Sequence, residues 1–556
     1  MIRIKKYILV GLVALTATSC NDFLTTTPYD ALSPSTTWAT EDDAQKFAVG
    51  CYGGDNDQVP GWESGETLLY LDCMSDFAYN NFPWEGYTSF GNGTISPSGG
   101  HSFYSYSVIR RCNTFLENVE GIPFTDPAVK KDLIAQVRFL RAYNYFVMNW
   151  MYGGVPIVSN YTTADEAKVP RETEAKVREF IETELDALTG DLNDEPAALG
   201  RVAKGAALAL RMREALYYGD WATAKDRAEK IKALKLYSLD SNYSNLFRIS
   251  GKSSKEIILS VQYIPNTKTL GTIGQMYNNG DGGWSSIVPT QNLVDTYEMK
   301  NGLTINETGS GYDATHPYAN RDPRMGMSIY YPGSNFTKDD GTTTVFNTLD
   351  KEIAGKANPN YSLAADNSSK TALTWAKYLD PITQYNATGI WDTEASPIVF
   401  RYAEVLLTYA EAENELNGPS ASVYDALDEI RERVGMPAVD RTKYASKDKL
   451  RELIQRERAV EFAGEGLRRA DILRWKTADG KMLAEKVLNG KLLRVVGSVT
   501  MDASISPEMR ALINPNAQVE ERMIEERIFK PFHRYLPIPL GAIDKNPKLT
   551  QNDGYQ

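Results

Sequence analysis

Residues 127–156 read PAVKKDLIAQVRFLRAYNYFVMNWMYGGVP, and this stretch decides the fold class. From Pro127 to Tyr152 the apolar side chains recur at helical spacing and form two separate stripes. One stripe contains Leu133, Val137, Leu140, Val147 and Met151, and the other contains Phe139, Ala142, Tyr143, Phe146 and Trp150. A helix that is apolar on two sides lies between other elements. Because Gly153-Gly154 then ends the periodic run, we predict a long buried helix over 127–152.

Further helical segments come in pairs. The ranges 203–218 and 221–234 make one pair, 402–416 and 422–434 a second, 447–464 and 467–475 a third, and 172–188 pairs with the helix over 127–152. Each pair has the size of a tetratricopeptide hairpin, about 34 residues, but long insertions separate the pairs. The sequence therefore predicts a mainly α fold, with a tetratricopeptide-like helix-pair scaffold over about 38–52, 107–234 and 400–480.

The segments 53–106 and 235–399 have a different composition. Both are rich in Gly, Asn and Ser or Thr, and many aromatic residues of 53–106 stand between them. The range 255–263 is a strand candidate, and loops of such length are usually functional or disordered. We expect an irregular, loop-rich face with a few short strands, followed by a C-terminal docking segment (481–556) that packs back through 535–539. Scaffold, face and docking segment would form one domain over 38–556.

The N-terminus has the features of an export signal. Arg3, Lys5 and Lys6 precede an apolar run that ends at Thr18-Ser19-Cys20. The run is shorter than the ~20 residues that a membrane-spanning helix needs, so residues 1–19 are interpreted as a secretory signal peptide. Cleavage would leave Cys20 as the N-terminal residue, ready for lipid attachment, with 20–37 as a lipid-anchored tether. An ordinary secreted protein with an incidental cysteine is the alternative.

Composition and charge narrow the class of protein. The chain has 42% hydrophobic residues, as globular proteins do, and a formal net charge of −12. That acidity argues against nucleic-acid binding, which needs a basic surface. Besides Cys20 there are only Cys51, Cys73 and Cys112. An odd number cannot pair completely, so a bond between Cys73 and Cys112 and free buried thiols both remain open.

Catalytic and metal-binding signatures are weak. The three histidines have no metal-ligand spacing, and no nucleophile elbow or phosphate-binding loop is present. The turns at 55–57 and 281–283 lack the rest of a calcium loop with its closing glutamate. Glu461 and Glu465 are expected to form salt bridges with Arg458, Arg468 and Arg469 rather than to act as an acid–base pair. We predict no catalytic residue, no metal and no cofactor.

Eight stretches, in order along nearly the whole chain, resemble the SusD/RagB family of surface lipoproteins from Bacteroidetes. They are 20–28, 110–116, 135–156, 255–263, 320–325, 401–407, 456–469 and 537–555. The resemblance implies a non-enzymatic protein that binds glycans at the cell surface, with its acylated Cys20 in the outer membrane. It also implies a partner, a SusC-type TonB-dependent transporter over which the protein sits as a lid.

The resemblance places binding aromatics in the loop 77–104 and in the loop after the strand, near Trp284. Sugars offer C–H patches to aromatic faces and hydroxyl groups to polar side chains, and pockets for them combine both. We predict Trp84 and Trp284 as stacking platforms, with Asp76, Tyr79 and Asn80 as polar partners. Three other functions remain open: peptide binding, a surface glycoside hydrolase, and a scaffold that recruits only proteins.

Overall fold

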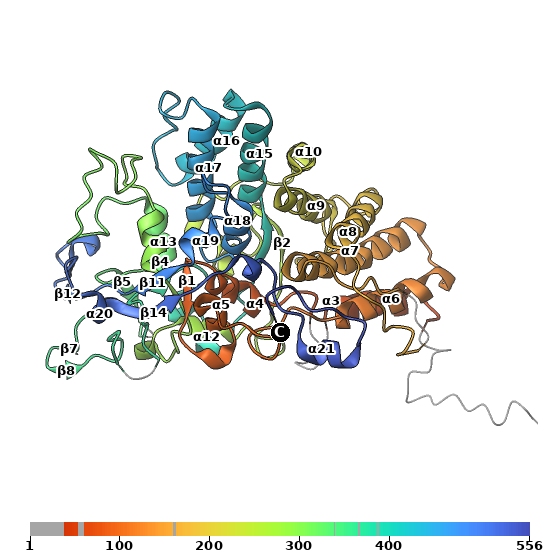
Figure 1. Cartoon of the computed structure of the whole chain (residues 1–556), viewed down its shortest axis with the longest axis horizontal. Helices are drawn as coiled ribbons and strands as arrows, with labels where there is room; N and C mark the ends of the chain where they lie inside the picture. The colour runs from red at the N-terminus through yellow and green to blue at the C-terminus, as the bar shows by residue number, and fades with distance from the viewer. Residues whose placement is uncertain are drawn as a thin grey trace, which may run out of the picture.

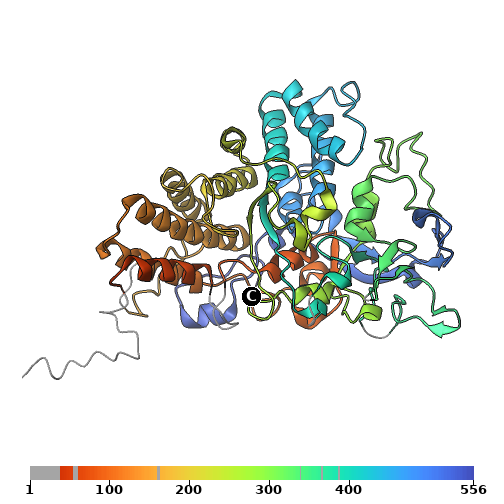
Figure 2. The same ribbon diagram turned by 180° about the vertical axis from the view of Figure 1, so that it is seen from behind.

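The computed structural model describes residues 38–53, 61–159, 163–338, 340–364, 367–385 and 389–555. The predicted signal peptide (1–19), Cys20 and the 20–37 tether lie outside these residues. Helices fill one side and the top of the molecule, whereas irregular chain and short strands fill the other side (Figure 1). The view from behind shows the same division (Figure 2). The predicted mainly α fold with a loop-rich face is confirmed.

Helix α7 (Pro127–Tyr152) has the bounds that the sequence predicts. The Asp126 side chain caps it by accepting a hydrogen bond of 2.8 Å from the backbone N–H of Ala128. Gly153 ends it in the left-handed region, with φ 69°. Both stripes are largely buried, because α7 packs between helices α6 (Ser107–Asn118) and α8 (Glu174–Leu188).

The other predicted helix pairs are also confirmed. They are α9 (Lys204–Tyr218) with α10 (Trp221–Leu234), α15 (Tyr402–Asn417) with α16 (Ala421–Arg433), and α17 (Lys447–Glu461) with α18 (Arg468–Arg474). Helix α10 packs against both α9 and α15, which joins the first pairs to the later ones. Helix α3 (Glu41–Tyr52) closes the row against α6 and α7.

Every sheet in the described residues has only two strands. The pairs are β1 (Ala78–Asn80) with β3 (Ile287–Pro289), β2 (Ile257–Ser260) with β10 (Ile398–Arg401), β4 (Ile329–Tyr330) with β9 (Thr374–Trp375), β5 (Asn335–Thr337) with β6 (Thr343–Val345), β7 (Glu352–Ile353) with β8 (Lys356–Ala357), β11 (Gly490–Leu493) with β14 (Met523–Arg527), and β12 (Gly497–Val499) with β13 (Ala511–Ile513). A two-stranded ribbon is marginally stable alone, so this face depends on the helices behind it. The strand predicted over 255–263 is the shorter β2.

Short helices connect these strands. On the loop-rich face they are α4 (Gly65–Tyr70), α5 (Thr88–Asn92), α11 (Tyr243–Leu246), α12 (Thr272–Met276), α13 (Gln291–Thr296) and α14 (Pro323–Ser328), with the 3-10 turns η1 (Leu71–Met74), η2 (Pro83–Glu85), η4 (Ile249–Gly251), η5 (Asn279–Asp281), η6 (Ile382–Gln384) and η7 (Gly389–Trp391). The 3-10 turn η3 (Val119–Gly121) follows α6 in the scaffold. The C-terminal segment adds α19 (Ala484–Val487), η8 (Pro507–Met509), α20 (Val519–Arg522), η9 (Pro531–Arg534) and α21 (Leu540–Lys545).

Buried ion pairs attach the loop-rich face to the scaffold. The carboxylate of Glu461, at the end of α17, accepts from Arg401 of β10 at 2.7 Å and from Arg433 at 2.6 Å. Arg324 of α14 reaches the same carboxylate at 3.1 Å. Glu465 pairs with Arg401 at 2.6 Å and with Lys377 at 2.8 Å. We call Glu461, Glu465 and these four basic partners the buried ion cluster.

The predicted partners of Glu461 and Glu465 were therefore wrong, although ion pairing itself is confirmed. Arg458 pairs with Asp471 of α18 at 3.1 Å, and Arg468 pairs with Asp76. Arg469 donates to the backbone carbonyls of Met74 and His533. Three of the true partners of Glu461 come from other elements, β10, α14 and α16, 28 to 137 positions away, and helical spacing carries no information about them.

The C-terminal docking segment returns to the scaffold. The backbone N–H of Leu536 donates to the carbonyl of Met151 at the end of α7, at 2.8 Å, and Leu536 and Ile538 are buried. The predicted packing of 535–539 against the body is confirmed.

Cys51, Cys73 and Cys112 are buried free thiols, so Cys73 and Cys112 do not form a disulfide in this structure. Among the described residues, no helix has the length and apolarity that crossing a membrane requires.

Candidate functional site

The short β1–β3 ladder brings the two predicted tryptophans to the same end of one structure. Its strands are antiparallel, with Asn80 opposite Ile287. The ladder continues one step further, because the N–H of Asn81 donates to the carbonyl of Ser286 at 2.9 Å. Trp84 follows β1 and Trp284 precedes β3, so in an antiparallel pair both leave from this end. Two loops about 200 residues apart in sequence thus meet here.

Trp84 lies in the turn η2 and is 77% exposed. Its ring stacks on that of Phe82, with centroids 4.6 Å apart and an angle of 22° between the planes. Gly86 closes the turn with φ 89°, where any Cβ would press on the backbone of His101. The indole therefore stands out from the surface on a fixed turn, backed by a second ring.

Trp284 has a comparable support. It is 42% exposed, and its ring centroid lies 4.7 Å from that of Trp391, with 56° between the planes. The Trp391 Nε1–H donates to the carbonyl of Gly282 at 3.3 Å. A Cβ on Gly274 would overlap the Trp391 ring, so only glycine leaves room for it. We call Phe82, Trp84, Trp284 and Trp391 the aromatic platform.

Trp391 is a residue that the sequence reasoning missed. It lies in η7, inside a long segment rich in Gly, Asn and Thr that gave no periodic signal. A tryptophan in such a segment resembles Trp84 and Trp284, and this composition was the available signal.

The three predicted polar partners occupy different environments. Tyr79 is half-buried on β1, opposite Val288, and burial raises the pKa of its phenol to about 12, so it stays a neutral hydrogen-bonding group. Asn80 is 1% exposed, and its Nδ2 donates to the carbonyl of Ser286 at 3.1 Å and to the carboxylate of Glu85. Asn80 thus fastens η2 to the β3 loop.

Asp76 lies further inside. It is 3% exposed, and both of its carboxylate oxygens accept from Arg468 at 2.9 Å. In this structure Asp76 and Asn80 position the loops, whereas Tyr79 and the tryptophans reach the surface. We therefore leave Asp76 and Asn80 out of the direct ligand contacts proposed below.

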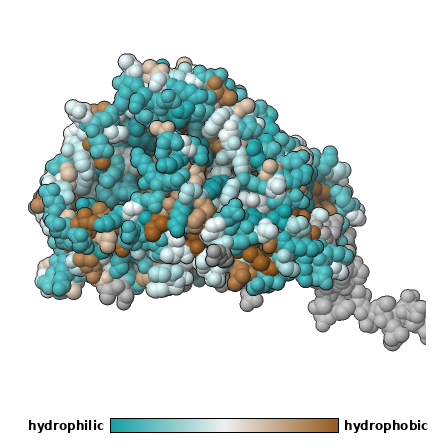
Figure 3. Space-filling view, in the orientation of Figure 1, coloured by the Kyte–Doolittle hydropathy of each residue, from teal (hydrophilic) through white to brown (hydrophobic). Residues whose placement is uncertain are grey.

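Polar groups surround the platform. Glu85 is half-buried beside Trp84, and burial raises the pKa of its carboxyl above the ordinary value. The loop before Trp284 is joined to its neighbour by two hydrogen bonds: the Asn279 Nδ2 donates to the carbonyl of Pro359 at 3.1 Å, and the N–H of Gly280 donates to the Asn360 Oδ1 at 2.7 Å. Apolar patches and polar surface alternate along the lower half of the molecular face (Figure 3). Flat rings with carboxyl and amide groups in the same loops suit a polyhydroxylated ligand.

The turns at 55–57 and 281–283 were not expected to hold calcium. Residues 281–283 form a turn, with Gly282 in the left-handed region at φ 82°. Residues 55–57 lie outside the described residues. In the part of the chain that the structure describes, no three His, Cys, Asp or Glu side chains come together in a way that could hold a metal ion.

Comparison with known proteins places this arrangement in a family. The sequence profile of the SusD family matches residues 255–555. The chain belongs to the SusD family. A second profile, described as "Starch-binding associating with outer membrane", matches residues 100–216. Family membership confirms the resemblance drawn from the eight motifs.

Relatives of this SusD-family chain match it over most of their length. A SusD-like protein of Formosa agariphila is 25% identical and covers 99% of this chain and 98% of its own. The starch-binding protein SusD of Bacteroides thetaiotaomicron is 23% identical, over 81% of this chain and 77% of its own.

Solved structures agree with the fold. A SusD-like carbohydrate-binding protein from Bacteroides fragilis superposes with a TM-score of 0.78 at 27% identity, covering 93% of this chain and all of its own. A second SusD-like protein from the same species gives a TM-score of 0.76 at 25% identity and covers 95% of this chain.

Proposed function

We propose that this protein is a cell-surface glycan-binding lipoprotein that captures oligosaccharides or polysaccharides without cleaving them. One observation carries the proposal. Two tryptophans from distant segments are exposed at the same end of the β1–β3 ladder, and each is backed by a second aromatic ring. Exposing such rings in water is unfavourable, so their fixed, exposed placement favours a ligand with flat apolar faces.

The chemistry around the platform fits sugars. The rings of Trp84 and Trp284 supply surfaces for pyranose C–H groups, and the neutral Tyr79 phenol and the amides of Asn279 and Asn360 supply hydrogen bonds. The acids nearest to Trp84 in sequence are engaged: Asp76 by Arg468, and Glu85 by Asn80. These ion-paired and hydrogen-bonded acids support a role in binding rather than in bond cleavage.

The cellular role rests on family membership and on the export signal. We propose that acylated Cys20 anchors the protein in the outer membrane, facing the cell exterior. There it would pass its glycan to a SusC-like TonB-dependent transporter. The names of the relatives, a starch-binding protein and a carbohydrate-binding protein among them, support this assignment.

Affinity electrophoresis of the purified protein tests the binding function. Gels containing starch, xylan, mannan, laminarin or pectin should slow the wild-type protein in at least one case. Trp84→Ala and Trp284→Ala should each weaken that retardation about tenfold, equivalent to ~1.4 kcal/mol. Leu416→Ala removes a side chain of similar exposure, 44%, from the helical scaffold and serves as the matched control.

Three results would contradict the proposal. Retardation by none of the glycans, with binding to a peptide library instead, would indicate a peptide-binding protein. Release of reducing ends from a bound glycan would indicate a hydrolase. Copurification of the tagged full-length protein without a large outer-membrane barrel would contradict the transporter partnership.

A further inference from the structure

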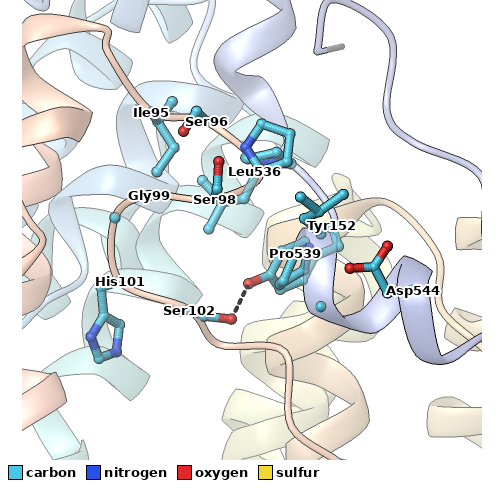
Figure 4. Close-up of a pocket in the computed structure, with 15 residues that line it drawn as sticks. Ile95, Ser96, Ser98, Gly99, His101, Ser102, Tyr152, Leu536, Pro539 and Asp544 are labelled. Carbon is cyan, nitrogen blue, oxygen red and sulfur yellow. Dashed lines mark hydrogen bonds between the residues drawn. The ribbon is translucent and has the colours of Figure 1, made fainter.

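A cavity of about 400 Å³ lies between two segments on the side of the molecule that carries α21 (Figure 4). The loop 95–102 forms one wall, and the docking segment from Leu536 to α21 forms the other. The two walls are joined where the N–H of Leu540 donates to the carbonyl of Pro97 at 2.8 Å. The buried ring of Tyr152, the last residue of α7, lies between them.

The cavity is fixed to the scaffold and formed in advance. The Tyr152 hydroxyl accepts from the N–H of Phe103 at 2.9 Å and lies 3.4 Å from the Ser102 hydroxyl. The Asn552 Nδ2 bridges the carbonyls of Tyr152 and Leu536, at 2.9 and 2.7 Å. Hydrogen bonds thus attach both walls to the C-terminal end of α7. A ligand would therefore bind to a site that is already ordered.

The lining indicates which ligands fit. It has flat apolar surface from Pro97, Pro539 and Leu540, hydroxyl groups from three serines, and one exposed carboxylate, Asp544. Among the residues that the structure describes, no Lys or Arg lines it, and burial lowers the pKa of His101 to about 4, so that imidazole is neutral at pH 7. A carboxylate without a cation repels anionic groups, whereas it accepts hydrogen bonds from the hydroxyls of neutral sugars.

The cavity is next to the aromatic platform. The N–H of His101 donates to the carbonyl of Gly86 at 3.0 Å, and its ring stacks on that of Tyr87 at 4.7 Å. Gly86 comes two residues after Trp84, a span of about 7 Å at most. A single oligosaccharide of a few residues is long enough to lie on Trp84 and reach the cavity.

We propose that this cavity is a second subsite, which holds a neutral sugar residue of the same glycan chain that stacks on Trp84. The inference rests on the proposed glycan-binding function and adds a ligand class: uncharged, and longer than the unit that the platform alone covers.

Gly541 provides the variant for the test. It lines the cavity from α21, its φ lies outside the left-handed region, and a Cβ there would meet no atom within 4 Å. Gly541→Trp should therefore fill the cavity without straining the backbone. Gly541→Ala, which adds only a methyl group, is the matched control.

Calorimetry with ladders of malto-, cello-, xylo- and manno-oligosaccharides measures affinity against chain length. We expect the affinity of the wild-type protein and of Gly541→Ala to rise with length beyond the shortest binding oligosaccharide. Gly541→Trp should bind that shortest ligand with the affinity of the wild-type protein, but its affinity for the long oligosaccharides should be about tenfold lower. Carbodiimide labelling of Asp544 in the wild-type protein should be blocked by long oligosaccharides and not by the shortest.

The outcomes separate the two proposals. If Gly541→Trp follows the wild-type length dependence while Trp84→Ala loses binding, the second subsite is refuted and the glycan-binding function stands. If the wild-type protein binds none of the ladders and none of the polysaccharides, both proposals fall. Tighter binding of uronate-containing oligosaccharides than of neutral ones, abolished by Gly541→Trp, would refute the neutral ligand class.

Discussion

Asp76 and Arg468 form a two-bond ion pair across 392 positions of the sequence. The Nε and Nη2 of the guanidinium each donate to one carboxylate oxygen at 2.9 Å. The guanidinium also lies over the ring of Phe77, 4.1 Å from its centroid. Asp76 directly precedes the Phe77–Asn80 stretch, so this pair ties the strand that leads to Trp84 onto α18.

Removing one partner of this pair should destabilise the protein. Asp76→Ala leaves Arg468 buried without its counter-charge, so we expect the free energy of unfolding to fall by about 3–5 kcal/mol. The double variant Asp76→Leu/Arg468→Met should lose less, because no charge stays uncompensated. Urea unfolding measures both. If Asp76→Ala keeps wild-type stability and loses glycan affinity, Asp76 is a ligand contact, as the sequence suggested.

Gly274 controls the ring behind Trp284. Because a Cβ at this position overlaps the indole of Trp391, Gly274→Ala should displace that ring, lower stability by about 1–3 kcal/mol and weaken glycan binding. Gly271→Ala, in the same turn, meets only a backbone oxygen at 3.4 Å and should change neither. Unfolding and affinity electrophoresis of the two variants provide the comparison; equal behaviour would show that Trp391 does not support the platform.

Asp72 should make stability depend on pH. Burial raises the pKa of this carboxyl from 3.8 to about 7, although it accepts a hydrogen bond from the Gly464 N–H at 2.7 Å. Since the folded-state pKa is the higher one, the stabilising contribution is complete below about pH 4 and is lost as the pH rises to about 7. The free energy of unfolding of Asp72→Asn should thus increase relative to that of the wild type by up to ~1.4 kcal/mol per pH unit as the pH rises across this window. A pH-independent difference in urea unfolding would contradict this assignment.

Glu461 should make stability depend on pH in the opposite direction. Burial opposes its ionisation, but Arg433, Arg401 and Arg324 outweigh that effect and hold the pKa of Glu461 well below its ordinary value. The contribution of Glu461 to the free energy of unfolding is complete above the pKa that it has in the unfolded chain. This contribution is lost as the pH falls toward the lower pKa of the folded protein. Glu461→Gln should therefore cost about 3–5 kcal/mol at neutral pH.

The control for Glu461 lies on the same helix. Glu452 pairs with Lys449 on the exposed side of α17, and exposed pairs contribute about 0–1 kcal/mol. Glu452→Gln should therefore leave urea unfolding almost unchanged. Equal effects of the two substitutions would mean that the buried ion cluster does not hold the loop-rich face.

Much of the helical scaffold was predictable from sequence, because its signals are local. Periodic apolar residues and Gly153-Gly154 located α7, predicted over about 127–152, and the same periodicity located the other helix pairs. The loop-rich face has no such signals. Its strands are two to five residues long, and β1–β3 and β2–β10 pair across large sequence distances, so neither periodicity nor composition determines these partners.

In the candidate site, the residue type correctly predicted surface exposure for the tryptophans but not for all of the polar side chains. Trp84 and Trp284 lie at the surface as expected. Asp76 and Asn80 are buried, because their partners, Arg468 and the carbonyl of Ser286, come from segments that a local reading cannot bring close. Trp391 was missed for the same reason, since its importance comes from contact with Trp284.

The β1–β3 ladder has a consequence for how specificity can change. The two tryptophans stand on loops from separate parts of the chain that are bonded to each other through Asn80 and Asn81, so an insertion beyond these bonds would move one ring and leave the other ring and the helices in place. A change of ligand would then require insertions in one or both of these surface loops and no change in the helices beneath them.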